Sequence, residues 1–317
     1  MSLASGAGRL LRGLVVALSW LVLLSVAALI VVRLLGLDAH WHLFVPLSGL
    51  PLMAAGTLVL LILLVVLRAG WSASFALLLV VVLSLLVLPR ILPDGTDVPA
   101  GAPRLRVASV NTFRGQVNAR AVVDLVRRRQ IQVLAVQELT PDGLAALEAA
   151  GIGQVLPYRL LARPDSNLFS ALPLAAPAPG WPQGVATVQT GGRTVGVLAV
   201  HTVYPVGSVT GWQASFDALG RQLAKPPADL VVVGDFNASL DHAPLRRLIR
   251  SAGLTDSHAE LGHWSPTWPV WDRPVPPVVQ LDHVLHGPGV AAVALHEFYV
   301  PGTDHKLIEA DLAVLGR

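Results

Sequence analysis

Polar side chains that can bind a metal ion or move a proton follow short apolar runs in the C-terminal two thirds of this 317-residue chain. In the segment VVVGDFNAS (231–239), a β-branched run leads through Gly234 into Asp235 and Asn237. Side chains two positions apart on a strand point to the same side, so both polar groups face one place. Burying them without partners would cost several kcal/mol, which predicts that other groups meet them there. A turn in which both side chains bond locally to the backbone is the alternative for this segment alone.

The same pattern occurs at five predicted strands: an apolar run is followed by a side chain that can bind a metal ion or transfer a proton. These side chains are Asn111, Glu138, His201, Asp235 with Asn237, and Asp282 with His283. A sixth pair, Asp304 and His305, follows the last predicted strand. Because successive strand residues point to opposite faces, His283 should point away from Asp282 and have a structural role.

The elements that must position these side chains alternate between strands and helices. We predict strands at 104–111, 131–139, 193–205, 229–237, 279–286 and 294–300. Helices are predicted at 118–130, 141–150, 214–225 and 242–253. Their boundaries carry suitable residues: Asn118 as an N-cap, Pro141 in a first turn and Gly253 at a C-terminus. Such alternation is typical of a layered α/β domain.

The first hundred residues are far more apolar than the rest of the chain. Apolar runs occupy 14–32, 52–67 and 71–88. The first and third are long enough to cross a hydrocarbon core, which takes about 20 residues. The second reaches that length only if it begins near Leu43 and tolerates two prolines near its start. A cleaved signal peptide, the alternative for the first run, would have a shorter apolar stretch and a small-x-small cleavage site.

These runs predict three parts. Residues 1–90 form a membrane anchor with three transmembrane helices at about 12–34, 43–67 and 71–88. Residues 91–103, rich in Pro, Gly and Asp, form a linker, and residues 104–317 form the soluble domain.

Few charges set the orientation of the anchor. Arg9 and Arg12 precede the first predicted span, and Arg68 lies between the second and third. The positive-inside rule places all three in the cytoplasm, although Arg33 and Arg90 then lie outside and make the bias small. We therefore expect a multi-pass protein of the cell membrane with an extracytoplasmic soluble domain. The absence of cysteine fits either compartment.

The soluble half is nearly neutral. Of 23 Lys and Arg residues, five lie in the first hundred positions and eighteen beyond them; of 20 Asp and Glu residues, three lie there and seventeen beyond. This balance argues against a strongly basic nucleic-acid track. No P-loop, Gly-x-Ser-x-Gly or His-Glu-x-x-His motif occurs in the sequence, so no competing chemistry emerges.

Taken together, seven segments resemble the endonuclease/exonuclease/phosphatase superfamily, the DNase I-like metal-dependent phosphoesterases. They are SVNTF (109–113), VQEL (136–139), AVHTVYP (199–205), GDFNAS (234–239), PTWP (266–269), LDHVL (281–285) and TDHKL (303–307). The match covers about residues 104–315 in the family's order and approximate spacing. It implies an α/β fold, a four-layer α-β-β-α sandwich with its site at one edge of the sheets, here preceded by three transmembrane helices. Membrane-anchored bacterial members of the family look similar.

The resemblance implies a divalent cation, Mg²⁺ or Mn²⁺, as the cofactor. Glu138 would be its principal ligand, with Asn111 beside it as a ligand or an orienting group. Asp304 would bind the metal directly or through water. A hard cation of this kind prefers a few carboxylates and retained waters.

The resemblance also implies catalytic roles. Asp235 would orient and deprotonate the attacking water, and Asn237 would hold that water or the phosphate. His201 and His305 would donate hydrogen bonds to the phosphoryl oxygens. Asp282 would pair with His305, fixing its tautomer and favouring its charged form.

The expected function is hydrolysis of phosphoester bonds by in-line attack of an activated water, by an enzyme of the phosphodiesterase, phosphatase or nuclease type. Its partners would be the lipid bilayer and a phosphoester substrate, either nucleic acid or a phospholipid or inositol-phosphate head group; no obligate protein partner is inferred. Phe113 stands where some members carry a second acid, and Ala171 where many carry an arginine. Phe113 argues against a second metal site, and Ala171 leaves no arginine there for the substrate. These departures also keep an alternative open, a non-catalytic, membrane-tethered binding or scaffold module on the same fold.

Overall fold

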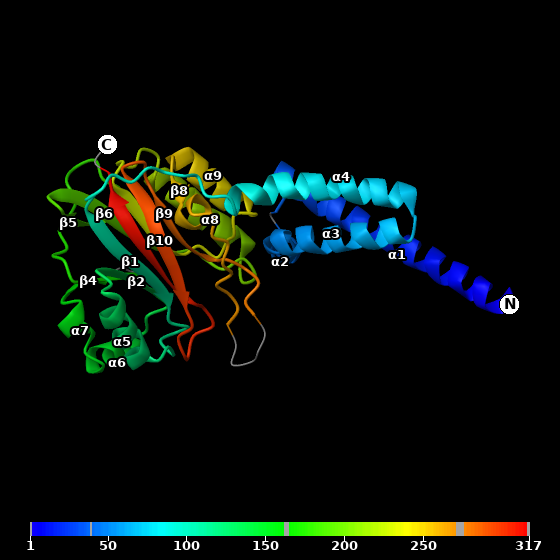
Figure 1. Ribbon diagram of the computed structural model, residues 1–317. Helices are drawn as coiled ribbons and strands as arrows, with labels where there is room; N and C mark the ends of the chain where they lie inside the picture. Colours follow the sequence, from blue (N-terminus) through cyan, green and yellow to red (C-terminus); the bar gives the residue numbers. More distant parts are fainter. Residues whose placement is uncertain (1, 39, 162–164, 271–275, 316–317) are drawn as a thin grey trace. The chain divides into compact units, whose positions relative to one another are not determined.

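The structure, a computed structural model, describes residues 2–38, 40–161, 165–270 and 276–315. The chain divides into two compact units, Met1–Pro89 with Asp241–Ala243 and Arg90–Leu240 with Pro244–Arg317. All the strands of the described residues belong to the second unit (Figure 1).

The first unit is built from apolar helices. They are α1 (Ser2–Leu35), α2 (Trp41–Ser48), α3 (Leu50–Val66) and α4 (Gly70–Val87), followed by the 3₁₀ turn η1 (Leu88–Arg90). Among the described residues, α1 and α4 are long and apolar enough to cross a membrane, and α2 with α3 form a pair bent by 66°. The bend falls at Gly49, between the two prolines at positions 46 and 51, in the segment where one span was predicted. The unit therefore offers two spans, or three if the bent pair is one span.

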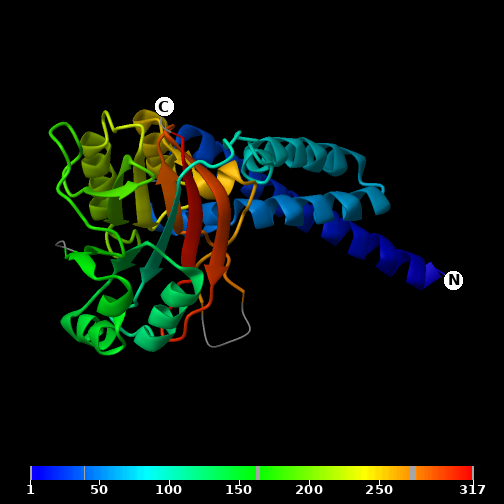
Figure 2. The same ribbon diagram turned by 60° about the vertical axis from the view of Figure 1, so that its left-hand side comes forward.

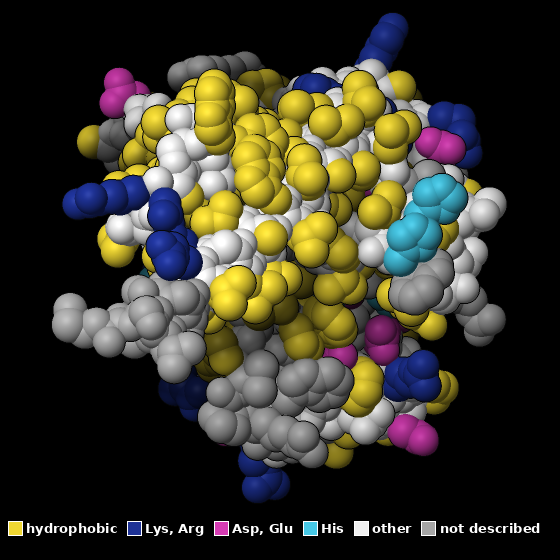
Figure 3. Space-filling view, turned by 90° about the vertical axis from the view of Figure 1, so that its right-hand side faces the viewer, with side chains coloured by type: hydrophobic (Ala, Val, Ile, Leu, Met, Phe, Trp, Pro, Cys, Tyr) yellow, Lys and Arg dark blue, Asp and Glu magenta, His cyan; other side chains and the backbone are white. Residues whose placement is uncertain are grey.

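Large apolar side chains face outward from these helices. Leucines of α1, α3 and α4 pack together inside the unit. Other large side chains stay exposed, among them Leu21, Val59, Val66, Trp71 and Leu85. Figure 3 shows hydrophobic side chains gathered over much of the upper half of the view. A contiguous apolar surface of this kind is typical of a segment that contacts lipid.

Two mixed β-sheets form the centre of the second unit. The strands are β1 (Arg104–Asn111), β2 (Val133–Gln137), β3 (Tyr158–Leu160), β4 (Ser166–Ser170), β5 (Ala186–Thr190), β6 (Arg193–His201), β7 (Leu230–Asp235), β8 (Thr255–Asp256), β9 (Asp282–His286), β10 (Val290–Phe298) and β11 (Leu307–Val314). One sheet has the order β10-β11-β1-β2-β4-β3, and the other has the order β5-β6-β7-β9-β8. The pairs β1–β2 and β6–β7 are parallel, and the remaining pairs are antiparallel.

Helices cover the outer faces of the two sheets. They are α5 (Ala119–Arg129), α6 (Pro141–Ala149) and α7 (Ile152–Val155) on the first sheet, and α8 (Val209–Gln222) and α9 (Ala243–Ala252) on the second (Figures 1 and 2). Alternation along β1 shows how the layers form. Val107 packs between the sheets against Val231, whereas Ala108 belongs to the core beneath α5 with Val122. The predicted four-layer α-β-β-α sandwich is confirmed.

Several strands were missed by the sequence analysis. β3, β4, β5 and β8 are short, and β3, β5 and β8 are edge strands. β11 was missed because Glu309 and Asp311 interrupt its apolar pattern. In the structure Glu309 is buried, and its carboxylate lies 2.6 Å from Nε of Arg129 on α5. A partner distant in the sequence thus allows a charged residue inside a central strand.

Gly234 lies where the backbones of β6 and β7 are too close to leave room for a side chain. Its φ is 154°, and a Cβ there would lie 1.9 Å from the backbone carbonyl oxygen of Val200. Because backbone cannot move aside cheaply, we expect Gly234→Ala to lower the free energy of unfolding by about 3 kcal/mol. Denaturant-induced unfolding of the detergent-solubilised chain would measure this loss. The control Gly220→Ala, in α8, meets nothing within 4 Å and should be neutral or slightly stabilising; equal stability of the two variants would contradict the prediction.

Candidate active site

The candidate site lies where the ends of strands from both sheets meet. Asn111 ends β1 beside the C-terminal end of the parallel strand β2, which Glu138 directly follows. In the other sheet, the parallel strands β6 and β7 end with His201 paired in register with Asp235. Asp235 is also in register with Asp282, the first residue of the antiparallel strand β9. Strand order and direction therefore bring these five side chains to one region.

The buried carboxylate of Asp235 is central to the site. Its Oδ1 accepts a 2.7 Å hydrogen bond from the backbone N–H of Asn237, and its Oδ2 accepts a 3.0 Å bond from Nδ2 of Asn111. The Nε2 atoms of His201 and His305 lie 3.8 Å and 3.7 Å from the same Oδ2. Burial raises the pKa of Asp235, and the two imidazoles counteract that rise. Both interpretations of the GDFNAS segment thus hold in part, because Asp235 makes a local turn bond and also meets distant partners.

His305 is held by Asp282. Its Nδ1 lies 2.9 Å from Oδ2 of Asp282, and both side chains are buried. Burial would lower the pKa of His305, but the charges of Asp282 and Asp235 outweigh it and raise the pKa to about 10. At neutral pH His305 is therefore a cation that can donate from Nε2. Oδ1 of Asp282 is buried and has no hydrogen-bond partner among the described residues.

His201 has a carboxylate partner that the sequence analysis did not identify, Asp165. Nδ1 of His201 lies 3.1 Å from Oδ2 of Asp165, whose Oδ1 accepts a 3.2 Å bond from the backbone N–H of Leu139. Burial would lower the pKa of His201, but the bond to Asp165 and the nearby carboxylates raise it overall. Asp165 directly precedes β4, a strand that the sequence analysis also missed. Had that strand been predicted, the position of Asp165 next to its end would have marked it as a candidate site residue.

Glu138 and Asn111 are joined by a hydrogen bond. Nδ2 of Asn111 donates to Oε1 of Glu138 at 3.2 Å as well as to Asp235, so in this orientation it links two carboxylates. Oε2 of Glu138 accepts a 2.9 Å bond from the backbone N–H of Arg114. Oε1 of Glu138 lies 3.9 Å from Nε2 of His201. The Glu138 side chain is 27% exposed, close to the 28% of Asp165, so these two acids of the site are the most accessible to solvent.

Unusual backbone conformations cluster here. Phe113, Glu138 and Asn237 have φ values of 47°, 54° and 44°. Each such conformation costs on the order of 1–3 kcal/mol and persists only where the surroundings over-determine it. At Asn237 the surroundings include a 3.0 Å bond from Nδ2 to the carbonyl oxygen of Thr202. The strain holds polar side chains in positions that relaxed strand ends would not provide.

Asp304 lies at the edge of the same group. Its Oδ1 is 4.0 Å from Nε2 of His305, and its Oδ2 accepts a 3.1 Å bond from Nε1 of Trp268. The indole of Trp268 thereby orients the acid, a role that the motif PTWP did not reveal.

The donor set fits a hard divalent cation. Five carboxylates surround two imidazoles, so the group is negatively charged even with both imidazoles protonated. The acids are Glu138, Asp165, Asp235, Asp282 and Asp304. Within the described part of the chain, Asp235, Asp282 and His305 each offer one ligand atom, all within 4.8 Å of one another. Oxygen-rich sites of this charge suit Mg²⁺ or Mn²⁺. This cluster differs from the predicted ligand set of Glu138, Asn111 and Asp304.

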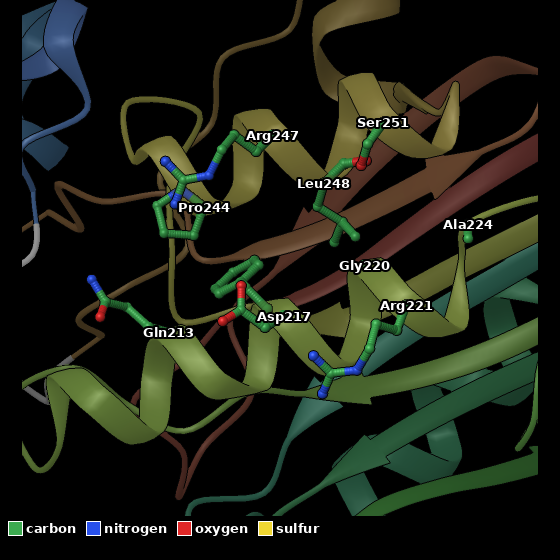
Figure 4. A pocket seen from close by; sticks show the side chains of 10 residues that line it. Gln213, Asp217, Gly220, Arg221, Ala224, Pro244, Arg247, Leu248 and Ser251 are labelled. Carbon is green, nitrogen blue, oxygen red and sulfur yellow. The ribbon is translucent and has the colours of Figure 1, made fainter.

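A groove lies elsewhere on the second unit. It has a volume of about 790 Å³, runs between α8 and α9 and is lined by Asp217, Arg221 and Arg247 among others (Figure 4). It includes none of the candidate site residues. This groove is therefore separate from the candidate site.

Comparison with known proteins agrees with the geometry. The model of the endonuclease/exonuclease/phosphatase family matches residues 108–305. The chain belongs to this family. Members are typically metal-dependent phosphoester hydrolases. None of the curated proteins that were compared with this chain matches it.

Solved structures share the fold of this family member. D. rerio TDP2 complexed with a single-strand DNA product superimposes with a TM-score of 0.53 at 15% identity, over 67% of this chain and 99% of that chain. An endonuclease/exonuclease/phosphatase from Beutenbergia cavernae superimposes with a TM-score of 0.51 at 18% identity, over 67% of this chain and 72% of that chain. An endonuclease/exonuclease/phosphatase family protein from Bacteroides thetaiotaomicron superimposes with a TM-score of 0.52 at 14% identity, over 67% of this chain and 95% of that chain. At these identities the likeness concerns the fold.

Removing the partner of His305 should destabilise the second unit. Asp282→Ala leaves a buried imidazolium without its bonded carboxylate, so we expect a loss of about 3 kcal/mol in the free energy of unfolding, measured in EDTA. Asp217→Ala, at an exposed position of α8, is the control and should change stability by less than about 0.5 kcal/mol. Similar losses in both variants would show that the Asp282–His305 pair contributes no particular stability.

Proposed function

We propose that this chain is a membrane-anchored, divalent-metal-dependent phosphoesterase that hydrolyses phosphoester bonds by in-line attack of an activated water. The observation that carries the proposal is the approach of two imidazoles, His201 and His305, to one buried carboxylate, Asp235. Hydrolysis of a phosphoester needs a group that accepts a proton from water and donors that stabilise charge on the phosphoryl oxygens. The three side chains meet both needs within one site.

Asp235 acts as the general base. It accepts a proton as the water oxygen attacks phosphorus and the bond to the leaving oxygen breaks. Its raised pKa brings its basicity closer to neutral pH, which favours proton transfer. Asn237, fixed by its bonds to Asp235 and Thr202, holds the water or the phosphate.

The two imidazoles stabilise the transition state. Held as a cation by Asp282, His305 donates from Nε2 to a phosphoryl oxygen. His201 does the same from its own Nε2, because Asp165 occupies its Nδ1. Donors fixed in advance in a largely buried site cost little reorganisation when charge develops.

A divalent cation fits the acidic side of the site. Glu138 would hold it, with Asn111 orienting Glu138 and Asp304 contributing directly or through water. Such a cation, Mg²⁺ or Mn²⁺, supplies Lewis-acid stabilisation of the phosphoryl and leaving oxygens.

The substrate is proposed as one of two phosphoester classes. Nucleic acid is supported by the fold shared with TDP2, which was solved with a single-strand DNA product. A phospholipid or inositol-phosphate head group is supported by the apolar helices of the first unit and by the near-neutral charge of the soluble half. The activity assay below separates these two classes.

Activity of site variants tests the proposal. We expect the detergent-solubilised chain to hydrolyse bis-p-nitrophenyl phosphate, single-stranded DNA or phospholipid vesicles with Mg²⁺ or Mn²⁺ and not with EDTA. Asp235→Asn and Glu138→Gln should each lower the rate by at least about 100-fold. His296→Gln, at an exposed position on β10, is the matched control and should retain full activity.

Three results would count against the enzyme. Full activity in Asp235→Asn or activity that survives EDTA would contradict the proposed mechanism. No turnover of any substrate, together with no metal-induced rise in melting temperature, would favour the non-catalytic binding module, because a cation that binds the folded state must stabilise it.

The anchor is proposed to cross the membrane three times, with residues 1–90 as anchor, 91–103 as linker and 104–317 as the catalytic domain. The number of spans decides the side of the catalytic domain, because an odd number puts the two ends of the anchor on opposite faces. Three spans with Arg9, Arg12 and Arg68 inside place the domain outside the cytoplasm.

The absence of cysteine makes this topology directly testable. We expect Gln189→Cys, on an exposed position of β5, to react with a membrane-impermeant maleimide in intact cells. Gly8→Cys, before the first predicted span, should react only after lysis. Equal labelling of the two positions in intact cells would mean that the bent pair α2–α3 does not cross.

A further inference from the structure

The far face of β9 carries a second group of side chains that can bind metal. Asp282 and His283 are successive residues and point to opposite faces of the strand. His283 approaches Asp256 at the end of β8 and His258 in the short helix α10 (Ser257–Glu260). These three are buried and each offers one ligand atom, all within 4.8 Å of one another. None of the three belongs to the candidate active site.

Both ring nitrogens of His283 have partners, and Nδ1 faces the carboxylate of Asp256. Its Nε2 lies 2.9 Å from the carbonyl oxygen of Ala238, so Nε2 must carry the hydrogen and donate. Its Nδ1 lies 2.6 Å from Oδ2 of Asp256. Nδ1 also lies 3.2 Å from Nε2 of Gln280. A cation would replace the proton between Nδ1 and Asp256, and the bond from Nε2 to a backbone carbonyl is the second interaction that a metal-ligating histidine usually makes.

His258 is buried and contacts Glu297, but its Nδ1 has no hydrogen bond within the described residues. Its side chain is 1% exposed, and neither ring nitrogen makes a hydrogen bond within the described ranges. Nδ1 lies 3.9 Å from Oδ1 of Asp256, too far for a hydrogen bond. Nε2 faces Oε1 of Glu297 at 3.4 Å, without hydrogen-bond geometry. An unsatisfied buried polar group costs about 1–3 kcal/mol, so a ligand between His258 and Asp256 would account for this residue.

The spacing of the three side chains suits a tetrahedral cation. With metal–ligand bonds of about 2.0–2.2 Å, the ligand atoms of a tetrahedral zinc site lie about 3.3 Å apart. The contacts from Asp256 to His283 and His258, 2.6 Å and 3.9 Å, bracket that value. Two imidazoles and one carboxylate favour Zn²⁺ over Mg²⁺, which prefers oxygen ligands. Glu297, on the other side of His258, is placed to accept from Nε2 once Nδ1 is bound.

We propose that Asp256, His258 and His283 form a second, buried divalent-cation site of the zinc class, separate from the candidate active site. The cation would connect β8, α10 and β9, three elements at one edge of the five-stranded sheet. Since β9 also carries Asp282, the site would fix the strand whose other face positions His305. Its role is structural and does not depend on the proposed hydrolysis.

Zinc content and thermal stability test the proposal. The full chain in detergent, stripped with a chelator and then dialysed against Zn²⁺, should carry one more tightly bound Zn²⁺ per chain than His258→Leu, measured by inductively coupled plasma mass spectrometry. Zn²⁺ should raise the melting temperature of wild type several degrees more than that of His258→Leu. Comparing variants removes the contribution of any Zn²⁺ at the candidate active site.

Two controls make the result decisive. His296→Leu removes an exposed histidine and should retain the wild-type zinc content. Because His258→Leu also loses the contact with Glu297, the rise in melting temperature of each variant is measured against its own metal-free value. Equal zinc content in wild type and His258→Leu overturns the proposal. So does an equal loss of zinc in His258→Leu and His296→Leu, which indicates binding at the surface.

Discussion

Burial of the Asp235 carboxylate is the constraint on which the candidate site depends. A carboxylate that is 1% exposed needs donors from the protein, and nearby in the sequence Asn237 supplies its backbone N–H at 2.7 Å and its Nδ2 at 3.4 Å. The others come from Asn111 in the facing sheet and from the imidazoles of His201 and His305. Strands of both sheets must therefore end next to the Asp235 carboxylate. The parallel pairs β1–β2 and β6–β7 allow this, because both strands of each pair end at the same edge of their sheet.

The same environment assigns different tasks to neighbouring titratable groups. Burial raises the pKa of Asp235, whereas carboxylate partners raise the pKa values of His201 and His305 against the effect of burial. A carboxylate made more basic beside imidazoles kept protonated is the combination that a hydrolytic site needs. Asp165 and Asp282 matter because they hold the two imidazoles in their donating form.

Strand β9 links the two polar groups of the second unit. Its alternation puts Asp282 on one face and His283 on the other, so one backbone positions both side chains. Asp256 and His258 are brought to His283 by β8 and α10, which hold few residues and little apolar surface of their own. Elements this short depend on neighbours for their stability, and a polar connection to a central strand supplies it.

Much of the fold and of the site follows from local sequence. Helices such as 141–149 and strands such as 104–111 have clear boundaries, because capping and alternation act over a few residues. The side chains Asn111, Glu138, His201 and Asp235 are recognisable because each directly ends or follows an apolar run. Edge strands such as β3 and β8 carry too few residues for a pattern to show.

Tertiary structure alone decided which of these groups meet and which unexpected partners they have. Asp165 reaches His201 and Trp268 reaches Asp304 across 36 residues of sequence each. Glu309 can lie inside β11 only because Arg129, 180 residues earlier, neutralises it. Residue type and local pattern are local properties, so they are enough to predict the chemistry available at each strand end. Distances, pKa shifts and the burial of His258 beside Asp256 and Glu297 arise between segments that only folding brings together.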